Sequence, residues 1–109
     1  MPRTISPSEL AELLKDPKKV FLLDVRLPVE HEFVALSQSM LIPLHELPRR
    51  FNEVVAEGDQ EIVVYCHHGV RSWQAALFLE QQGFQNLFSL DGGIDAWSIE
   101  IDPSIARYR

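Results

Sequence analysis

The sequence of 109 residues contains a single cysteine, Cys66. No internal disulfide can form, and no second cysteine is present to act as a resolving thiol. No apolar run approaches the roughly 20 residues that a membrane-spanning helix needs. Residues 1–4 lead into a polar segment instead of the apolar core of a signal peptide. Basic residues are scarce, because ten lysines and arginines face 16 acids and the net charge is −6. We therefore expect a cytoplasmic protein with no nucleic-acid or membrane partner.

The chain also lacks the Gly-x4-Gly-Lys pattern of a phosphate-binding loop, any internal repeat and any low-complexity linker. Its length suits one hydrophobic core but not two. Hydrophobic residues make up 46% and charged residues 24%, the composition of an ordinary soluble globular protein. We therefore expect a single domain over residues 1–109.

Short apolar segments alternate with helical patterns along the chain. Five segments have the pattern of strands, at residues 3–5, 20–25, 40–44, 61–65 and 86–90; the first is expected at an edge, and 20–25 and 61–65 have the pattern of buried strands. Helices are predicted over residues 7–14, 29–36, 45–56, 72–82 and 94–99, and Ser6, Pro7 and Glu9 form a capping-box pattern before the first of them. This alternation predicts an α/β fold of three layers, a short parallel sheet of about five strands with helices on both faces.

The predicted strand 61–65 ends at Cys66, and a short loop containing a glycine and an arginine follows. The next helix is predicted to begin at Ser72, with Ser72 as its N-cap. A thiol between a strand end and a helix start faces backbone N–H groups and the positive end of the helix dipole. Both favour the thiolate, which is the nucleophilic form. Cys66 is therefore predicted to be the catalytic residue.

The residues after Cys66 are predicted to complete the site. Arg71 lies where the helix dipole disfavours a cation, which indicates a role in binding anions or the thiolate. His67 and His68 are expected at the rim, where protonated imidazoles attract anions, and a general-base role for them stays open. No metal site is predicted, because three consecutive residues rarely direct their side chains at one ion. Gly69 supplies the backbone freedom of a tight loop.

Asp24 and Arg26 lie at the end of another predicted strand, which places them near the cysteine loop in such a sheet. Their expected role is structural hydrogen bonding, and a part in shaping the site is the alternative. His31 and His45 are expected on helix surfaces, without a role in chemistry.

Four short motifs follow one another along the chain. They are Leu22-Leu23-Asp24-Val25-Arg26, Ile42-Pro43-Leu44, the loop from Cys66 to Arg71, and Asp91-Gly92-Gly93-Ile94-Asp95-Ala96-Trp97. In this order and spacing they resemble the rhodanese family of sulfurtransferases, over nearly the whole chain. Two stretches depart from the family: residues 34–39 replace its Gly-His-Ile-x-Gly-Ala, and Leu27 stands where an acid is frequent.

The resemblance implies a persulfide mechanism without a cofactor. Cys66 would attack a sulfane-sulfur donor such as thiosulfate, hold the sulfur as Cys-S-SH, and pass it to a thiophilic acceptor: cyanide, a thiol or a protein. The backbone amides of residues 67–71, Val70 among them, would bind the outer sulfur. The end of the chain, Trp97 to Tyr108, is similar to rhodanese domains fused to E1-like adenylating enzymes. A small sulfur-carrier protein therefore joins the expected acceptors, beside a thioredoxin-like thiol.

Two other functions share part of this pattern. Cysteine phosphatases and arsenate reductases use a similar thiolate cradle, but they resemble His-Cys-x5-Arg, whereas this chain has Cys-x4-Arg with Tyr65 before the cysteine. Sulfur transfer is therefore preferred. The fold can also serve as a protein-binding or persulfide-relay module, although domains used only for binding usually lack the cysteine that this chain keeps.

Overall fold

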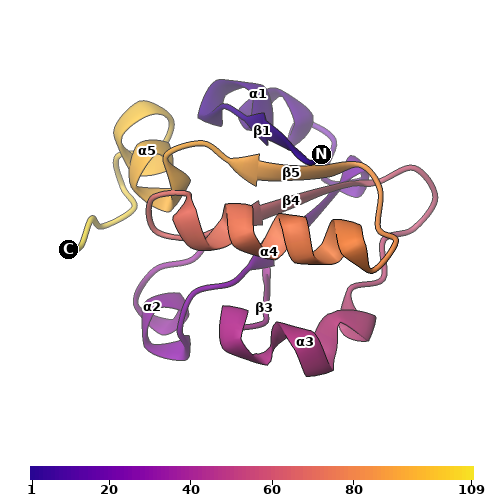
Figure 1. The fold of residues 1–109 in the computed structure, drawn as a ribbon. Helices are drawn as coiled ribbons and strands as arrows, with labels where there is room; N and C mark the ends of the chain where they lie inside the picture. The colour runs from indigo at the N-terminus through magenta and orange to yellow at the C-terminus, as the bar shows by residue number, and fades with distance from the viewer.

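A five-stranded parallel sheet runs through the computed structural model, which describes all residues from 1 to 109 (Figure 1). Its strands are β1 (Arg3–Ile5), β2 (Val20–Asp24), β3 (Met40–Leu41), β4 (Glu61–Tyr65) and β5 (Leu87–Leu90). They lie in the spatial order β1-β5-β4-β2-β3, and all four pairings are parallel. The strand that leads to Cys66, β4, therefore lies at the centre of the sheet, where it is most protected.

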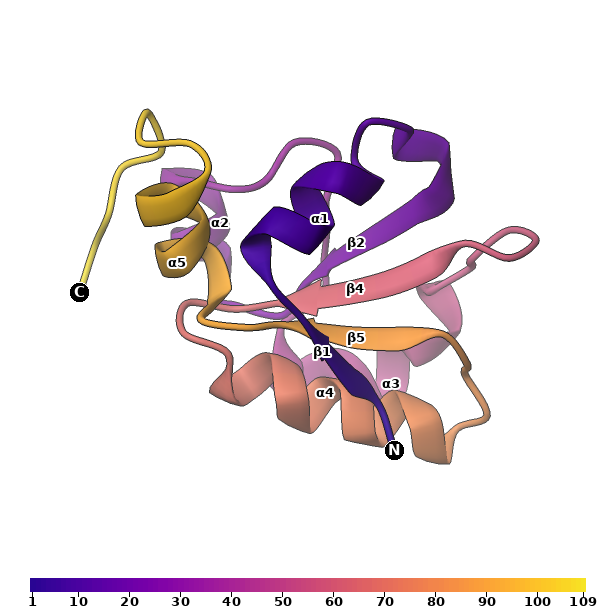
Figure 2. The ribbon, with the colours of Figure 1, turned by 90° about the horizontal axis from the view of Figure 1, so that it is seen from above.

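Helices cover both faces of the sheet (Figure 2). One face carries α1 (Pro7–Leu13) and α5 (Gly93–Glu100), and the other carries α3 (Leu47–Arg50) and α4 (Val70–Gln81). The short α2 (Pro28–Phe33) lies near the carboxyl ends of the strands. Each face buries its own apolar cluster, which includes Leu10, Ile94 and Trp97 on the first face and Leu47, Ala75 and Leu79 on the second. The predicted three-layer α/β fold is confirmed. None of the helices is long and apolar enough to cross a membrane.

The helix predicted over residues 45–56 is wrong. The structure has a single helical turn, α3, between two 3₁₀ turns at Leu44–Glu46 and Phe51–Glu53. Pro48 lacks an N–H group and is tolerated only in the first turn of a helix, so α3 begins directly before it. Arg50 then leaves the helical region, with φ −126° and ψ 3°. The apolar spacing of this segment is that of a helix, but its backbone leaves the helical region at Arg50 and again at Val54.

Two other elements are shorter than expected. The strand predicted over residues 40–44 is regular only at Met40–Leu41, although the Ile42 and Leu44 N–H groups still donate to the Asp24 and Val25 carbonyls at 2.9 and 3.0 Å. The helix predicted over residues 29–36 ends at Phe33, because Val34 is extended, with φ −148° and ψ 145°.

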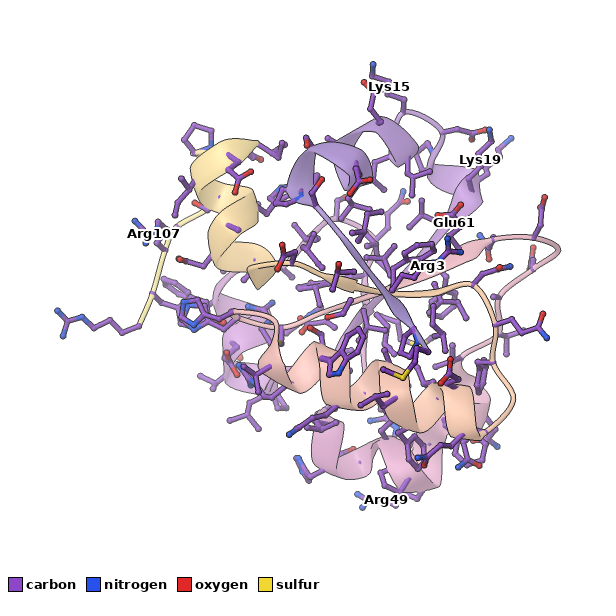
Figure 3. All side chains as sticks on the ribbon, turned by 45° about the horizontal axis from the view of Figure 1, so that its top comes forward. Arg3, Lys15, Lys19, Arg49, Glu61 and Arg107 are labelled. Carbon is purple, nitrogen blue, oxygen red and sulfur yellow. The ribbon has the colours of Figure 1, made fainter.

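The predicted capping box of α1 is confirmed. Ser6 Oγ accepts a hydrogen bond from the Glu9 N–H at 3.1 Å, and the Glu9 carboxylate accepts one from the Ser6 N–H at 2.9 Å. In Figure 3, basic side chains such as Lys15 and Arg49 extend outward from opposite sides of the molecule, whereas Arg107 lies beside α5. The basic side chains are thus spread over separate elements.

Candidate active site

Cys66 lies directly after β4, and backbone N–H groups surround its sulfur. The Gly69 N–H donates to Cys66 Sγ at 3.1 Å, and the Ser72 N–H donates at 3.3 Å. The loop turns tightly at Gly69, whose φ is +108°, a value that a residue with a side chain rarely adopts. Cys66 is 1% exposed, so its sulfur lies inside the loop. Two converging donors at a helix start are suited to stabilising negative charge on sulfur.

The prediction that Ser72 is the N-cap of the next helix is wrong. Helix α4 begins at Val70, after the left-handed Gly69, so Ser72 lies inside its first turn. The Ser72 side chain is fully buried. Its hydroxyl lies 3.4 Å from Cys66 Sγ, donates to the Gly69 carbonyl at 3.1 Å, and shares a 2.7 Å hydrogen bond with Ser89 Oγ on β5. Ser72 therefore connects the sulfur, the loop and the neighbouring strand.

The start of α5 packs against the backbone of the same loop. The Ile94 N–H donates to the Cys66 carbonyl at 2.9 Å, and the Asp95 N–H donates to the His67 carbonyl at 3.2 Å. Gly93, with φ +64°, touches both carbonyls so closely that a Cβ there would overlap them. The glycine pair at the start of α5 therefore lets the backbone of this helix lie directly against the backbone of the cysteine loop and hold it in place.

Arg71 does not extend freely toward the thiol but is bound to Glu30 on α2. Its Nη1 and Nη2 atoms donate to the two Glu30 carboxylate oxygens at 2.7 and 3.0 Å. These hydrogen bonds from Arg71 outweigh burial and hold the pKa of Glu30 at about 2. The predicted role of Arg71 toward anions stays a prediction. Sequence reasoning missed Glu30, because it is one of 16 acids and lies 41 residues from its partner.

Asp24 and Arg26 form a completely buried ion pair at the end of β2. Arg26 Nε and Nη2 donate to the Asp24 carboxylate at 2.9 and 2.7 Å, and Nη1 donates to the Tyr108 hydroxyl at 3.0 Å. The Tyr108 hydroxyl donates in turn to Glu30 Oε2 at 2.6 Å. His31, expected on a helix surface, lies 2.7 Å from Asp24 through its Nδ1 atom. A continuous network therefore joins β2 to the Glu30–Arg71 pair through the end of the chain.

His67 is sandwiched between two other rings. The Tyr108 ring stacks on it at 3.8 Å with an angle of 7°, and the His68 ring stacks at 3.9 Å with an angle of 27°. Burial, together with the neighbouring His68, lowers the pKa of His67, and its buried Nε2 atom has no hydrogen-bond partner. His68 is exposed at the rim, as expected, whereas His67 is largely covered. Nothing in the sequence near the loop indicates the contact with Tyr108.

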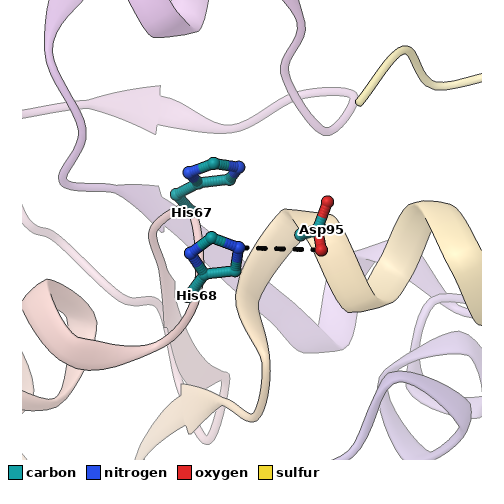
Figure 4. A group of neighbouring side chains, drawn as sticks. All are labelled: His67, His68 and Asp95. Atoms are coloured by element: carbon teal, nitrogen blue, oxygen red, sulfur yellow. Dashed lines mark ion pairs between the residues drawn. The ribbon is translucent and has the colours of Figure 1, made fainter. Parts of the chain in front are cut away.

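His67, His68 and Asp95 offer ligand atoms within 4.8 Å of one another (Figure 4). The His68 Nε2 atom lies 3.6 Å from Asp95 Oδ2, while Asp95 also binds Arg107 at 2.9 Å. A metal ion lies in the plane of an imidazole that binds it, along the lone pair of the nitrogen. Two stacked rings whose planes differ by 27° do not direct their lone pairs at one point. The cluster is therefore a poor metal site, and Cys66 does not belong to it.

Two hollows flank the loop. The larger, of about 540 Å³, is lined by the exposed apolar side chains of Leu27, Val29 and Phe33 and by the Glu30–Arg71 pair. The smaller, of about 300 Å³, lies on the other side of the loop and includes Gly69, the donor to the sulfur. The site therefore offers an apolar wall on one side of the cysteine loop.

Comparison with known proteins shows which family this chain belongs to. Residues 6–100 match the family model described as the rhodanese-like domain. The chain belongs to this family. A rhodanese-related protein of Thermoplasma volcanium has a crystal structure similar to this one, with a TM-score of 0.81 and 35% identity over 97% of this chain and 99% of that chain. The resemblance and the fold expected from the four motifs are both confirmed.

Curated relatives of this rhodanese-like chain include sulfurtransferases. A sulfurtransferase of Allochromatium vinosum is 35% identical over 106 residues, which cover 97% of each chain. The thiosulfate sulfurtransferase GlpE of Pseudoalteromonas translucida is 32% identical over 94% of this chain and 95% of that protein. The probable adenylyltransferase/sulfurtransferase MoeZ of Mycobacterium tuberculosis is 35% identical over 96% of this chain, which spans 27% of MoeZ. The similarity to domains fused to adenylating enzymes is therefore confirmed at the level of sequence.

Proposed function

We propose that this rhodanese-like chain, acting as a single domain, is a sulfurtransferase that carries a sulfane sulfur on Cys66. The observation that supports this most is the pair of backbone N–H groups, from Gly69 and Ser72, that converge on Cys66 Sγ at 3.1 and 3.3 Å. The same donors can bind the charge of a persulfide whose outer sulfur lies in the loop. The likeness to the sulfurtransferase of Allochromatium vinosum and to GlpE supports the same chemistry.

With thiosulfate as donor, the thiolate of Cys66 attacks the outer, sulfane sulfur. A bond forms between Sγ and that sulfur as the sulfur–sulfur bond of thiosulfate breaks, and sulfite leaves with the bonding electron pair. The resulting Cys66 persulfide then gives its outer sulfur to cyanide or to a thiol, and the thiolate returns. No oxidant or reductant is consumed. Sulfite leaves as an anion, so no acid is needed to protonate the leaving group.

A protein acceptor is the second proposal. Three apolar side chains, Leu27, Val29 and Phe33, are exposed beside the loop, and such a surface fits a polypeptide better than a small anion. The likeness to one part of MoeZ, named a probable adenylyltransferase/sulfurtransferase, supports an acceptor of the sulfur-carrier class.

Intact mass spectrometry after incubation with thiosulfate tests the proposed function. We expect a mass increase of one sulfur atom in the wild-type protein, and loss of that sulfur when cyanide is added. The Cys66→Ser variant should gain no sulfur and transfer none, while its circular dichroism melt stays close to that of the wild type. Transfer of sulfur by a folded Ser variant would exclude Cys66 as the carrier. Hydrolysis of an aryl phosphate by the wild type, without sulfur uptake, would favour the phosphatase alternative.

A further inference from the structure

The Glu30–Arg71 pair offsets the charge that would attract an anionic donor. Arg71 is the one permanently charged cation between positions 66 and 71, and Glu30 binds both ends of its guanidinium. The Glu30 side chain is 13% exposed and that of Arg71 is 32% exposed, so water screens the pair only in part. An anion that approaches this side of the loop therefore meets Arg71 as part of a neutral ion pair, and the guanidinium nearest the loop does not act as a free cation; Arg109, at the end of the chain, also lines the hollow.

The Glu30 carboxylate is fixed in this position by two further hydrogen bonds. Its Oε1 atom accepts the Leu27 N–H at 3.1 Å, and its Oε2 atom accepts the Tyr108 O–H at 2.6 Å. Burial and the hydrogen bond to Glu30 raise the pKa of Tyr108 to about 12, so this hydroxyl keeps its proton. To free Arg71 for an incoming anion, the Glu30 carboxylate would have to move away and lose these two hydrogen bonds, or stay in place as a charged, partly buried group without its cation.

The hollow beside the Glu30–Arg71 pair favours ligands that carry an apolar group. Leu27, Val29 and Phe33 supply apolar surface to a space of about 540 Å³, which is enough for an aromatic or aliphatic group. A donor that buries such a group gains affinity through the hydrophobic effect and does not depend on Arg71. The thiosulfate dianion has no apolar part and gains nothing from this apolar surface.

We propose that Glu30 is a specificity-determining residue that makes the site favour sulfane donors of low charge on an apolar group, organic thiosulfonates and persulfides, over the thiosulfate dianion. This inference rests on the proposed sulfur transfer at Cys66. With a thiosulfonate, RSO₂–S⁻, the thiolate attacks the outer sulfur, and the new Sγ–S bond forms as the bond to the RSO₂ group breaks. The sulfinate RSO₂⁻ leaves with the electron pair, and the persulfide stays on Cys66.

Steady-state transfer to cyanide from two matched donors tests the inference. Thiosulfate and benzenethiosulfonate present the same reacting sulfur, but the first is a dianion and the second a monoanion with an aromatic ring. Wild-type kcat/KM should be higher for benzenethiosulfonate. In Glu30→Gln, which keeps the shape of the side chain and loses its charge, we expect kcat/KM for thiosulfate to rise about tenfold and that for benzenethiosulfonate to change less than about threefold.

Two variants control for other causes. Glu53→Gln also removes the charge of a carboxylate held at two points, by Arg50 at 2.9 and 3.0 Å, but at a 3₁₀ turn outside the site. Arg50→Gln removes the cation of the same pair, again outside the site. Neither should change the ratio of the two kcat/KM values. An unchanged ratio in Glu30→Gln, or an equal shift in Glu53→Gln, would overturn the inference.

Salt dependence of the wild type and of Glu30→Gln gives a second test. A free cation beside the loop would attract thiosulfate, and kcat/KM would then fall steeply as salt screens the attraction. We expect kcat/KM for thiosulfate to fall more steeply with salt in Glu30→Gln than in the wild type, and equal slopes would overturn the inference. Failure of both donors to form a persulfide on Cys66 would instead refute the proposed function itself.

Discussion

The substitution Gly93→Ala tests whether the start of α5 holds the cysteine loop in place. A Cβ at Gly93 would lie 2.5 Å from the Cys66 carbonyl oxygen and closer still to that of His67. An ordinary contact with a Cβ is 3.4 Å or longer, so the loop backbone must move by roughly 1 Å to accept the methyl group. Such a displacement would shift the N–H groups that converge on the sulfur.

Gly58→Ala is the matched control for this substitution. Gly58 has φ +58°, near the +64° of Gly93, but nothing lies within 4 Å of a Cβ built there. Both variants should therefore lose the roughly 1–2 kcal/mol that a left-handed residue with a side chain costs. Gly93→Ala should lose a further 2–3 kcal/mol, on the order of other overpacked interiors. Its Tm should then lie about 10 °C or more below that of Gly58→Ala.

Thermal melts and sulfur transfer, measured on the same preparations, decide the outcome. At a temperature where both variants are folded, Gly93→Ala should lose roughly a hundredfold in kcat/KM, because misplacement near 1 Å has about that effect on a catalytic group. Gly58→Ala should retain the wild-type value. If Gly93→Ala melts with Gly58→Ala and keeps full activity, the loop does not depend on the start of α5, and the reasoning is wrong.

Two further predictions concern the ion pair of the site. Arg71→Ala leaves the Glu30 carboxylate unpaired beside the loop, so KM should rise about tenfold for thiosulfate and less for benzenethiosulfonate. Equal losses with both donors would indicate a structural role for Arg71. The folded pKa of Glu30, about 2, lies below its ordinary value of about 4.3, so its contribution to stability is complete above the higher value and is lost as pH falls through the lower one. Urea unfolding at about pH 5 and about pH 2 should show a larger loss in the wild type than in Glu30→Gln, and identical losses would contradict the assignment.

The sequence was sufficient to predict those parts of the site that depend on neighbours along the chain. An apolar strand, a cysteine, a glycine and a helix follow one another within about twenty residues, and this order alone places Cys66 at a strand end and a helix start. The role of Ser72 was predicted incorrectly for a local reason. The left-handed Gly69 is the N-cap instead, so the helix begins two residues earlier than predicted, at Val70.

Contacts between distant segments could not be predicted. Glu30 and Arg71 are 41 residues apart, and Arg26 and Tyr108 are 82 residues apart. Neither Glu30 nor Tyr108 lies in a pattern that distinguishes it from other acids and tyrosines, because the feature that gives each its environment is the packing of α2 and the end of the chain against the loop. For the same reason the stacking of His67 against Tyr108 had no signal near the cysteine.

The order of the strands has a consequence for how the protein is made. Strand β1 pairs only with β5, so Arg3 finds its partner, Phe88, 85 residues later in the chain. The central β4 likewise pairs with β2, which precedes it by 41 residues, starting with Val20 against Glu61. A ribosome must therefore release most of the chain before the sheet can close, and long-range pairing of this kind makes folding slow. Until β5 emerges, β1 and β4 expose unpaired edges, and this interval is when the nascent chain is most prone to aggregation.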